Sequence, residues 1–191
     1  DYAYRLEGAK TAAFEIIDQM LFQVPDYLVV PIGCGTNIGG YYKGFMDYYR
    51  LGLIDRLPRI IGVQAEGARA VINSFEEKRN DITPLASINT LASAIAVANP
   101  IDGLKALEAI NSTNGYAVSV TDNEILAAQH RLAKEEGISV EELDTIKGSG
   151  ADGRLTKEDL LNHLQAKSGG GSSKISEAAA QAKAVVDTPQ Q

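Results

Sequence analysis

Cysteine and long apolar runs are scarce in this sequence of 191 residues, and both scarcities exclude classes of protein. Cys34 is the only cysteine, so an internal disulfide is excluded. No apolar run approaches the roughly 20 residues that a membrane-spanning helix requires, and the start of the chain does not resemble a signal peptide. We therefore expect a cytoplasmic protein without a membrane contact.

Basic residues are also in short supply, with 18 Lys and Arg against 25 Asp and Glu and a net charge of -7. This balance argues against a nucleic-acid partner and against a polybasic membrane contact, since both need positive charge. The apolar share of 45% suits a packed core, and the length allows one domain with a small appendage. The chain begins at Asp1 in what is already the approach to a helix, so we expect a fragment.

A glycine-rich stretch between a β-rich run and a helical one is the most informative feature of the sequence. It reads Val30-Pro31-Ile32-Gly33-Cys34-Gly35-Thr36-Asn37-Ile38-Gly39-Gly40. Glycine permits positive φ angles and lets a ligand approach the backbone closely. Main-chain N–H groups at such a turn, together with those at the helix start, favour negative charge. The stretch therefore predicts an anion cradle with phosphate as its occupant.

One other interpretation of this stretch remains open besides phosphate binding. No Gly-Lys-Ser/Thr follows Gly40, and Ile38 stands where the third glycine of a dinucleotide loop belongs, so neither of those motifs applies. A glycine-rich turn can also serve tight packing alone. Cys34 is interpreted as a spacer rather than a reactive thiol, because His130 and His163, the only histidines, lie far along the chain.

Three β-rich runs, at residues 27–30, 59–64 and 116–120, alternate with helical patterns. These patterns cover residues 12–21, 41–50, 92–98, 103–110 and 125–136, with a turn and a helix at 66–79. Such crossover helices join parallel strands, so the sequence predicts an α/β fold with a partial parallel sheet and flanking helices. Ligands bind beyond the carboxyl ends of strands in such sheets, which is where the Gly33 loop lies.

The composition changes after Gly137, which is expected to end the helix that a Thr121–Glu124 capping box opens. Thr156 and Asp159 have similar capping spacing and predict a further short helix. We expect an α/β domain over residues 1–137, a small helical segment over 138–166, and a flexible linker and tail over 167–191.

Several motifs in residues 4–141 carry a family resemblance. They are Tyr4-Arg5-Leu6-Glu7-Gly8-Ala9-Lys10-Thr11, the glycine loop, Gly52-Leu53-Ile54-Asp55-Arg56-Leu57-Pro58, Gly62-Val63-Gln64-Ala65-Glu66-Gly67-Ala68 and Asn99-Pro100. Together they resemble threonine synthase, a fold-type-II enzyme that uses pyridoxal phosphate. The resemblance implies that the loop binds the cofactor phosphate through Gly33, Gly35 and Asn37, with Cys34 and Thr36 contributing main chain. The complete enzyme converts O-phosphohomoserine to threonine and phosphate.

The lysine that forms a Schiff base in this family stands in a Phe-Lys-Asp or Tyr-Lys-Asp context, and no such tripeptide occurs in the sequence. Lys10 is interpreted as a surface or packing lysine rather than a substitute. We therefore assign no catalytic residue, and no metal ligands, and expect no turnover by this chain.

A second resemblance covers about residues 142–164. It rests on Leu143-Asp144-Thr145-Ile146-Lys147-Gly148-Ser149-Gly150-Ala151-Asp152-Gly153-Arg154-Leu155-Thr156-Lys157-Glu158-Asp159-Leu160. This stretch resembles the peripheral subunit-binding domain of 2-oxoacid dehydrogenase acyltransferases, of the succinyltransferase kind. The resemblance implies docking of dihydrolipoyl dehydrogenase through Arg154, with Arg131 and Lys134 adding charge, and a structural Asp159 that accepts backbone N–H bonds. The two resemblances meet near Glu141.

Three hypotheses about function follow. The chain is a threonine-synthase-like lyase domain, a module that docks a dehydrogenase, or a non-functional chimera whose uncovered apolar faces lead to homo-oligomers. Arg131 and Lys134 also have a plainer interpretation, as exposed charges on an amphipathic helix.

Overall fold

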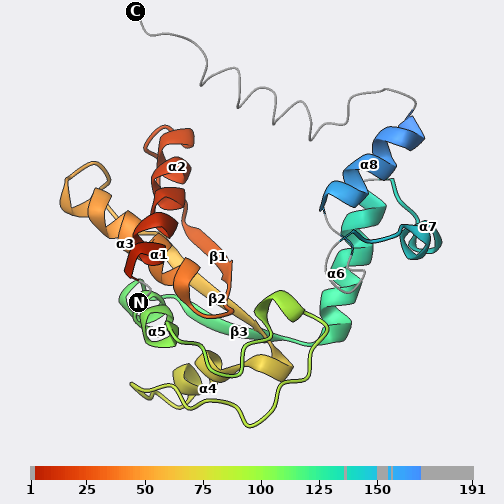
Figure 1. The fold of residues 1–191 in the computed structure, drawn as a ribbon. Coiled ribbons are helices and arrows are strands. Elements are labelled where there is room, and N and C mark those ends of the chain that lie inside the picture. Colours follow the sequence, from red (N-terminus) through yellow and green to blue (C-terminus); the bar gives the residue numbers. More distant parts are fainter. Residues whose placement is uncertain (1–2, 136, 150–154, 156, 169–191) are drawn as a thin grey trace, which may run out of the picture. The chain divides into compact units, whose positions relative to one another are not determined.

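The computed structural model describes residues 3–135, 137–149, 155 and 157–168. These residues form an α/β structure (Figure 1), as the sequence predicts. The chain divides into two compact units, Asp1–Leu126 and Ala127–Gln191, and each is described by itself. The three segment boundaries expected from the sequence stay a prediction. No helix in the described part of the chain is long and apolar enough to cross a membrane.

Three parallel strands form the centre of the first unit. They are β1 (Tyr27–Pro31), β2 (Arg59–Ala65) and β3 (Tyr116–Val120), arranged in the order β1-β2-β3. Val30 lies opposite Gly62, and Gly62 lies opposite Ala117. Each connection between neighbouring strands crosses over through a helix, because parallel strands cannot be joined by a tight turn. The parallel sheet predicted from the sequence is confirmed.

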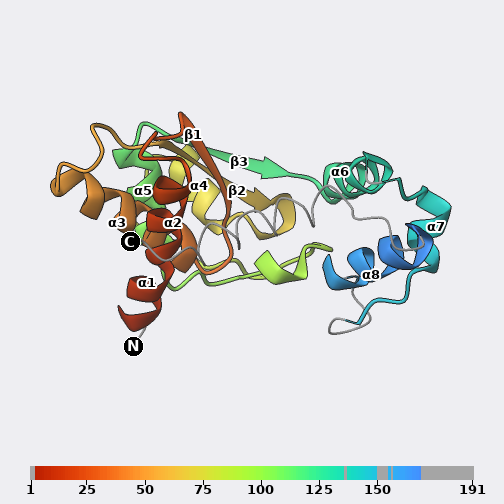
Figure 2. The same cartoon turned by 90° about the horizontal axis from the view of Figure 1, so that it is seen from above.

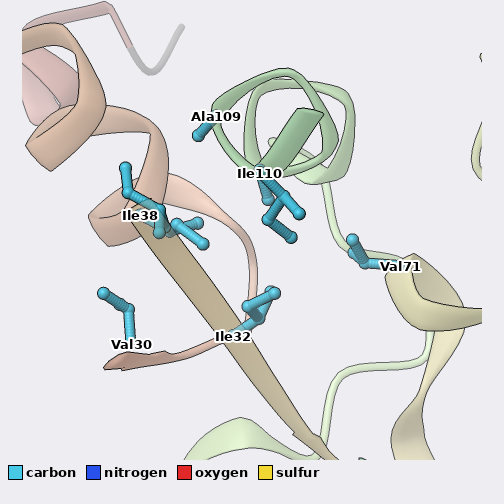
Figure 3. Packing of buried hydrophobic residues seen from close by; sticks show 8 residues of the cluster. Val30, Ile32, Ile38, Val71, Ala109 and Ile110 are labelled. Atoms are coloured by element: carbon cyan, nitrogen blue, oxygen red, sulfur yellow. The ribbon is translucent and has the colours of Figure 1, made fainter. Parts of the chain in front are cut away.

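The helices of this unit surround one face of the sheet (Figure 2). They are α1 (Ala3–Ala9), α2 (Thr11–Gln19), α3 (Thr36–Arg50), the 3₁₀ turn η1 (Glu66–Ala68), α4 (Ala70–Glu76), the 3₁₀ turn η2 (Ser93–Ile95) and α5 (Gly103–Ser112). The main core lies between the sheet and helices α3 and α5, where Ile38 and Ile110 are fully buried (Figure 3). Burial of each such side chain contributes about 1.5–3 kcal/mol to the free energy of folding. On the sheet, Val29 and Val118 are exposed.

A second core joins α2 to α3 through Ile17 and Phe45, both buried. The two helices approach closely because Gly44 has no side chain, and a Cβ there would lie 2.8 Å from Cβ of Ala13. Gly40 has the same role against α1, since its Cβ would lie 2.6 Å from Cβ of Ala9. These glycines are therefore helical packing positions and not helix breakers.

Two of the helices predicted from the sequence need correction. The helix expected from residue 41 begins at Thr36, inside the glycine-rich stretch, since Gly39 and Gly40 belong to its first turns. The helix expected over residues 92–98 is wrong, because only the η2 turn forms there. Ala92 and Ala96 have ψ angles of 62° and 78°, outside the helical region, and the Ala98 carbonyl accepts the Leu85 N–H at 2.9 Å. The helix propensity of alanine therefore does not decide the structure of this segment.

Helix α6 (Asp122–Glu135) begins as predicted. The Thr121 main-chain N–H and hydroxyl donate to the Glu124 carboxylate at 2.8 Å, and the Glu124 N–H donates back to the Thr121 hydroxyl. Gly137, just beyond the helix, has a φ of +78°. The capping box and the glycine stop are therefore confirmed.

The second unit contains α7 (Val140–Thr145) and α8 (Lys157–Ser168) around a small apolar core with Ala133, Ile138 and Leu143 at its centre. The Glu142 carboxylate lies 2.7 Å from Lys167 Nζ and 3.0 Å from His163 Nε2, and it also accepts the N–H of Ser139. These partners lower the pKa of Glu142 to about 2. Thr156, named above as a cap, lies outside the described residues.

Candidate functional site

The five loop residues singled out in the sequence lie together at the carboxyl end of β1, where α3 begins. They line a pocket of about 340 Å³ with Arg5, Pro31, Ile38, Ala94 and Ile95. In parallel α/β sheets this edge is the usual place for a ligand. The pocket therefore has the position that the sequence predicts for a binding site.

Gly35 is required by the shape of the loop. It precedes the first residue of α3 with a φ of +94°, a left-handed conformation that side chains rarely adopt. A Cβ at this position would collide with the main-chain carbonyl of Asp102, whose carbon would lie only 2.6 Å away. The loop thus packs against the start of α5 with no room for any residue except glycine.

Main-chain N–H groups of the loop are available to a ligand. Within the described part of the chain, no hydrogen bond engages the N–H groups of Gly33, Cys34 and Gly35. The Cys34 carbonyl accepts the Asp102 N–H at 2.9 Å, and in a trans peptide the next N–H, that of Gly35, points the opposite way. The first turn of α3 adds the partial positive charge of a helix N-terminus. This arrangement can bind an anion such as phosphate.

The Thr36 side chain is engaged elsewhere. Its hydroxyl donates to Asp102 Oδ2 at 2.7 Å, and Lys105 Nζ donates to Asp102 Oδ1 at 2.7 Å. Burial raises the pKa of Asp102, but the bonds from Lys105 and Thr36 and the charges of Lys105 and Arg5 outweigh burial and lower it. Asp102 is therefore a carboxylate in the folded state, and Thr36 can offer a ligand only its main-chain N–H and its hydroxyl lone pairs.

Comparison with known proteins agrees with this geometry. The family model described as pyridoxal-phosphate dependent enzyme matches residues 1–151. The chain belongs to this family. Membership implies pyridoxal phosphate as the cofactor. The match extends beyond the junction expected near Glu141, and no comparison supports the subunit-binding domain proposed for the residues after it.

Several threonine synthases are relatives of this chain. The chain is 49% identical over 138 residues to threonine synthase of Methanocaldococcus jannaschii and 42% identical over 137 residues to that of Mycobacterium bovis. Both alignments cover 72% of this chain, but only 34% and 36% of the relatives. The chain thus spans about a third of the length of the threonine synthases it matches.

Solved structures confirm the fold of the family. Threonine synthase from Escherichia coli has a TM-score of 0.53 at 17% identity, and covers 88% of this chain and 42% of its own. A fungal L-serine ammonia-lyase from Rhizomucor miehei has a TM-score of 0.57 at 20% identity, over 73% of this chain and 42% of its own. The sheet and its helices are therefore part of a fold-type-II domain.

The loop fits the phosphate group of the family's cofactor. Phosphate needs several converging donors, which the unengaged N–H groups supply, and a close approach of backbone, which Gly33 and Gly35 allow. A Cβ at Gly33 would meet the Ala94 carbonyl oxygen at 3.4 Å and narrow the pocket. The donor set and the available space therefore agree with the cofactor of this family.

Sequence reasoning missed Arg5, which lines the pocket, and two buried residues that support the loop, Asp102 and Gln64. Asp102 and Arg5 were not singled out, although Arg5 lies in the first family motif and Asp102 follows Asn99-Pro100 by two residues. Gln64 was also missed. It is fully buried, and its Nε2 donates to the Ile32 carbonyl, directly before Gly33, at 3.4 Å. Burial of a glutamine and an aspartate would have marked these two residues as supports of the site. The burial of a single residue cannot be read from the sequence.

Lys10 has the structural role expected from its context. Its Nζ lies 2.9 Å from Asp47 Oδ2 and 2.8 Å from Glu7 Oε2, so Lys10, at the start of α2, links α1 to α3. Lys43 also pairs with Glu7. Neither lysine lines the pocket at the glycine loop.

The residues assigned to partner binding are only partly described. Arg131 and Lys134 lie three positions apart on α6, and both are exposed. The Arg131 side chain is 81% exposed, and its Nε lies 4.0 Å from Glu135 Oε1. Arg154 lies outside the described residues. Asp159 Oδ2 accepts the Ser149 N–H at 2.8 Å, which is the type of bond that the second resemblance implies.

Proposed function

We propose that the first unit of this chain binds the phosphate group of pyridoxal phosphate at Gly33, Cys34, Gly35, Thr36 and Asn37. The observation that carries the proposal is the set of unengaged N–H groups at the start of α3, beside the pocket. Backbone donors and a helix N-terminus favour a phosphate dianion over neutral ligands. The five residues act through main chain, so the identities of Cys34 and Thr36 matter little to binding.

Different groups of the chain have different roles in holding the cofactor. The N–H groups bind the phosphate, Arg5 adds positive charge at the edge of the pocket, and Asp102 fixes the loop through Cys34 and Thr36. When bound, pyridoxal phosphate supplies an electron sink for carbanion chemistry. The partner of its ring nitrogen is not assigned within this chain.

For the whole protein we propose the reaction of the relatives, a lyase reaction in which O-phosphohomoserine and water give threonine and phosphate. The 49% identity to a threonine synthase supports this substrate class. We further propose that these 191 residues alone do not turn over, because the family's lysine context is missing from the sequence. The location of the protein in the cytoplasm and its assembly into homo-oligomers stay predictions.

Calorimetric titration of the 191-residue chain tests the binding proposal. Pyridoxal phosphate is expected to bind with 1:1 stoichiometry, inorganic phosphate to compete with it, and pyridoxal, the matched ligand without phosphate, not to bind. Pyridoxal phosphate binding that inorganic phosphate does not displace would overturn the proposal.

The proposed inactivity has its own test. Borohydride reduction and peptide mapping should find no single lysine modified stoichiometrically, and formation of threonine by this chain would contradict the proposed inactivity.

A second candidate function concerns the second unit. We propose that it docks dihydrolipoyl dehydrogenase through Arg131, Lys134 and Arg154, as its resemblance to subunit-binding domains implies, and the Ser149–Asp159 bond supports this alternative. Docking by exposed charges weakens as salt rises. Surface plasmon resonance at low and high salt, with an Arg131→Ala/Lys134→Ala variant as control, measures it. Absence of binding at low salt would exclude this candidate.

A further inference from the structure

The connection between α4 and α5 passes directly over the glycine loop. We call its residues 85–98 the strap; it belongs to the light-green segment in Figure 1. The strap contributes Ala94 and Ile95 to the pocket lining. At Gly33, a Cβ would lie 3.4 Å from the Ala94 carbonyl oxygen and 3.5 Å from Ile95 Cα, so strap and loop are in close contact. The strap is thus one wall of the phosphate pocket.

The strap has little internal structure to hold it there. Its regular structure is the three-residue turn η2, and none of its residues belongs to the buried core of the described chain. Ile88 and Leu91 are exposed by 41% and 62%. A segment with few buried contacts opens locally at low cost. Its position over the loop therefore depends on its hydrogen bonds to the rest of the unit.

Asp122 provides the densest of these tethers. Its Oδ1 accepts the Thr90 hydroxyl at 2.6 Å, and its Oδ2 accepts the Leu91 N–H at 3.0 Å. The Thr90 hydroxyl oxygen in turn accepts the Ala92 N–H at 3.1 Å. Ala92 lies two residues before Ala94, which lines the pocket. A further main-chain bond to the rest of the unit runs from the Asn89 N–H to the Gly67 carbonyl. The bond from the Leu85 N–H to the Ala98 carbonyl lies within the strap itself.

The Asp122 carboxylate is not needed to cap its own helix. Asp122 is the first residue of α6, and the capping bonds come from Thr121 and Glu124 on either side of it. An acidic residue in a first helical turn usually serves the helix dipole. Here both carboxylate oxygens bind the strap instead, 31 and 32 positions away along the chain.

We propose that Asp122 is a positioning residue that acts through Thr90 to hold the strap against Gly33, and that this tether slows the escape of a phosphate group from the loop. The inference rests on the proposed function, since the strap walls the same pocket. Asp122 itself does not line the pocket. Loss of the tether frees Ala94 and Ile95 to move away from the loop, so the bound group should leave faster.

The test compares matched variants of the full chain. In Asp122→Ala and Thr90→Val, the dissociation rate of pyridoxal phosphate in stopped flow should rise about 10-fold, the size expected for one lost bond to a charged group. Thr90→Ser keeps the hydroxyl and should retain the original rate. Asp81→Ala removes an exposed carboxylate of the same connection, one that pairs with Arg79, and should leave the rate unchanged.

Hydrogen exchange of the strap separates this inference from the proposed function. Exchange at Leu91 and Ala92 should rise by a similar factor in Asp122→Ala and Thr90→Val, but not in Thr90→Ser or Asp81→Ala. Unchanged dissociation and exchange in the first two variants would overturn the inference while the unaltered chain still binds pyridoxal phosphate. If the unaltered chain does not bind pyridoxal phosphate, the proposed function fails. The exchange rates at Leu91 and Ala92 then still test whether Asp122 holds the strap.

Discussion

Replacing Gly35 by alanine should abolish phosphate binding and lower the free energy of unfolding of the first unit by about 3–5 kcal/mol. The residue has a φ of +94°, and an alanine Cβ would press on the Asp102 carbonyl group. Relief of this clash would move the loop away from α5 and turn the Gly35 N–H out of place. Binding and stability should therefore be lost together.

Gly52→Ala is the matched control for this variant. Gly52 also has a positive φ, of +70°, but no atom lies within 4 Å of a Cβ there. The control should cost only about 1 kcal/mol and leave phosphate binding intact. Urea unfolding followed by tyrosine fluorescence reports the first unit, because the eight tyrosines all precede residue 127. Normal phosphate affinity in Gly35→Ala would contradict the cradle.

Replacing Gln64 by leucine is the second change with a large expected effect. Gln64 Oε1 accepts the N–H groups of Val71 and Ile72 at 3.0 and 3.1 Å, in the first turn of α4. The first N–H groups of a helix have no partner within it, so leucine would leave two buried donors unsatisfied. We expect a loss of about 3–5 kcal/mol in the free energy of unfolding.

The same urea measurement checks this prediction, with Gln23→Leu as the control at an exposed position. That control should change the free energy of unfolding by about 0.5 kcal/mol or less. An unfolding midpoint of Gln64→Leu equal to that of the original chain would show that α4 does not depend on its cap from β2. Phosphate binding adds a second readout, because Gln64 Nε2 also supports the residue before Gly33.

Local patterns in the sequence were sufficient for the strands, the parallel sheet and the capping box of α6. Each depends on neighbouring residues, such as Thr121 with Glu124, or on the spacing of β-rich runs. The loop was also found locally, because glycines after a strand mark it. Local reasoning failed where distant residues decide the structure, and residues 92–98, whose alanines favour a helix, form only the η2 turn.

Supports of the candidate site could not be predicted for the same reason. Asp102 is paired with Thr36 across 66 positions of sequence, and Gln64 with Ile32 across 32. Nothing in the neighbourhood of either residue shows that it is buried. Gly39 and Gly40 were likewise taken as part of a loop, although they belong to α3, where their lack of a side chain lets α1 approach closely.

The pairing of Thr36 with Asp102 also fixes the order of events during protein synthesis. The glycine loop leaves the ribosome well before its partner, since Asp102 follows Thr36 by 66 positions. Closing so long a segment costs chain entropy before any contact is gained. A nascent chain that ends before residue 102 therefore carries the loop without its support. If the loop binds phosphate as proposed, phosphate therefore stabilises the completed unit and not its precursors.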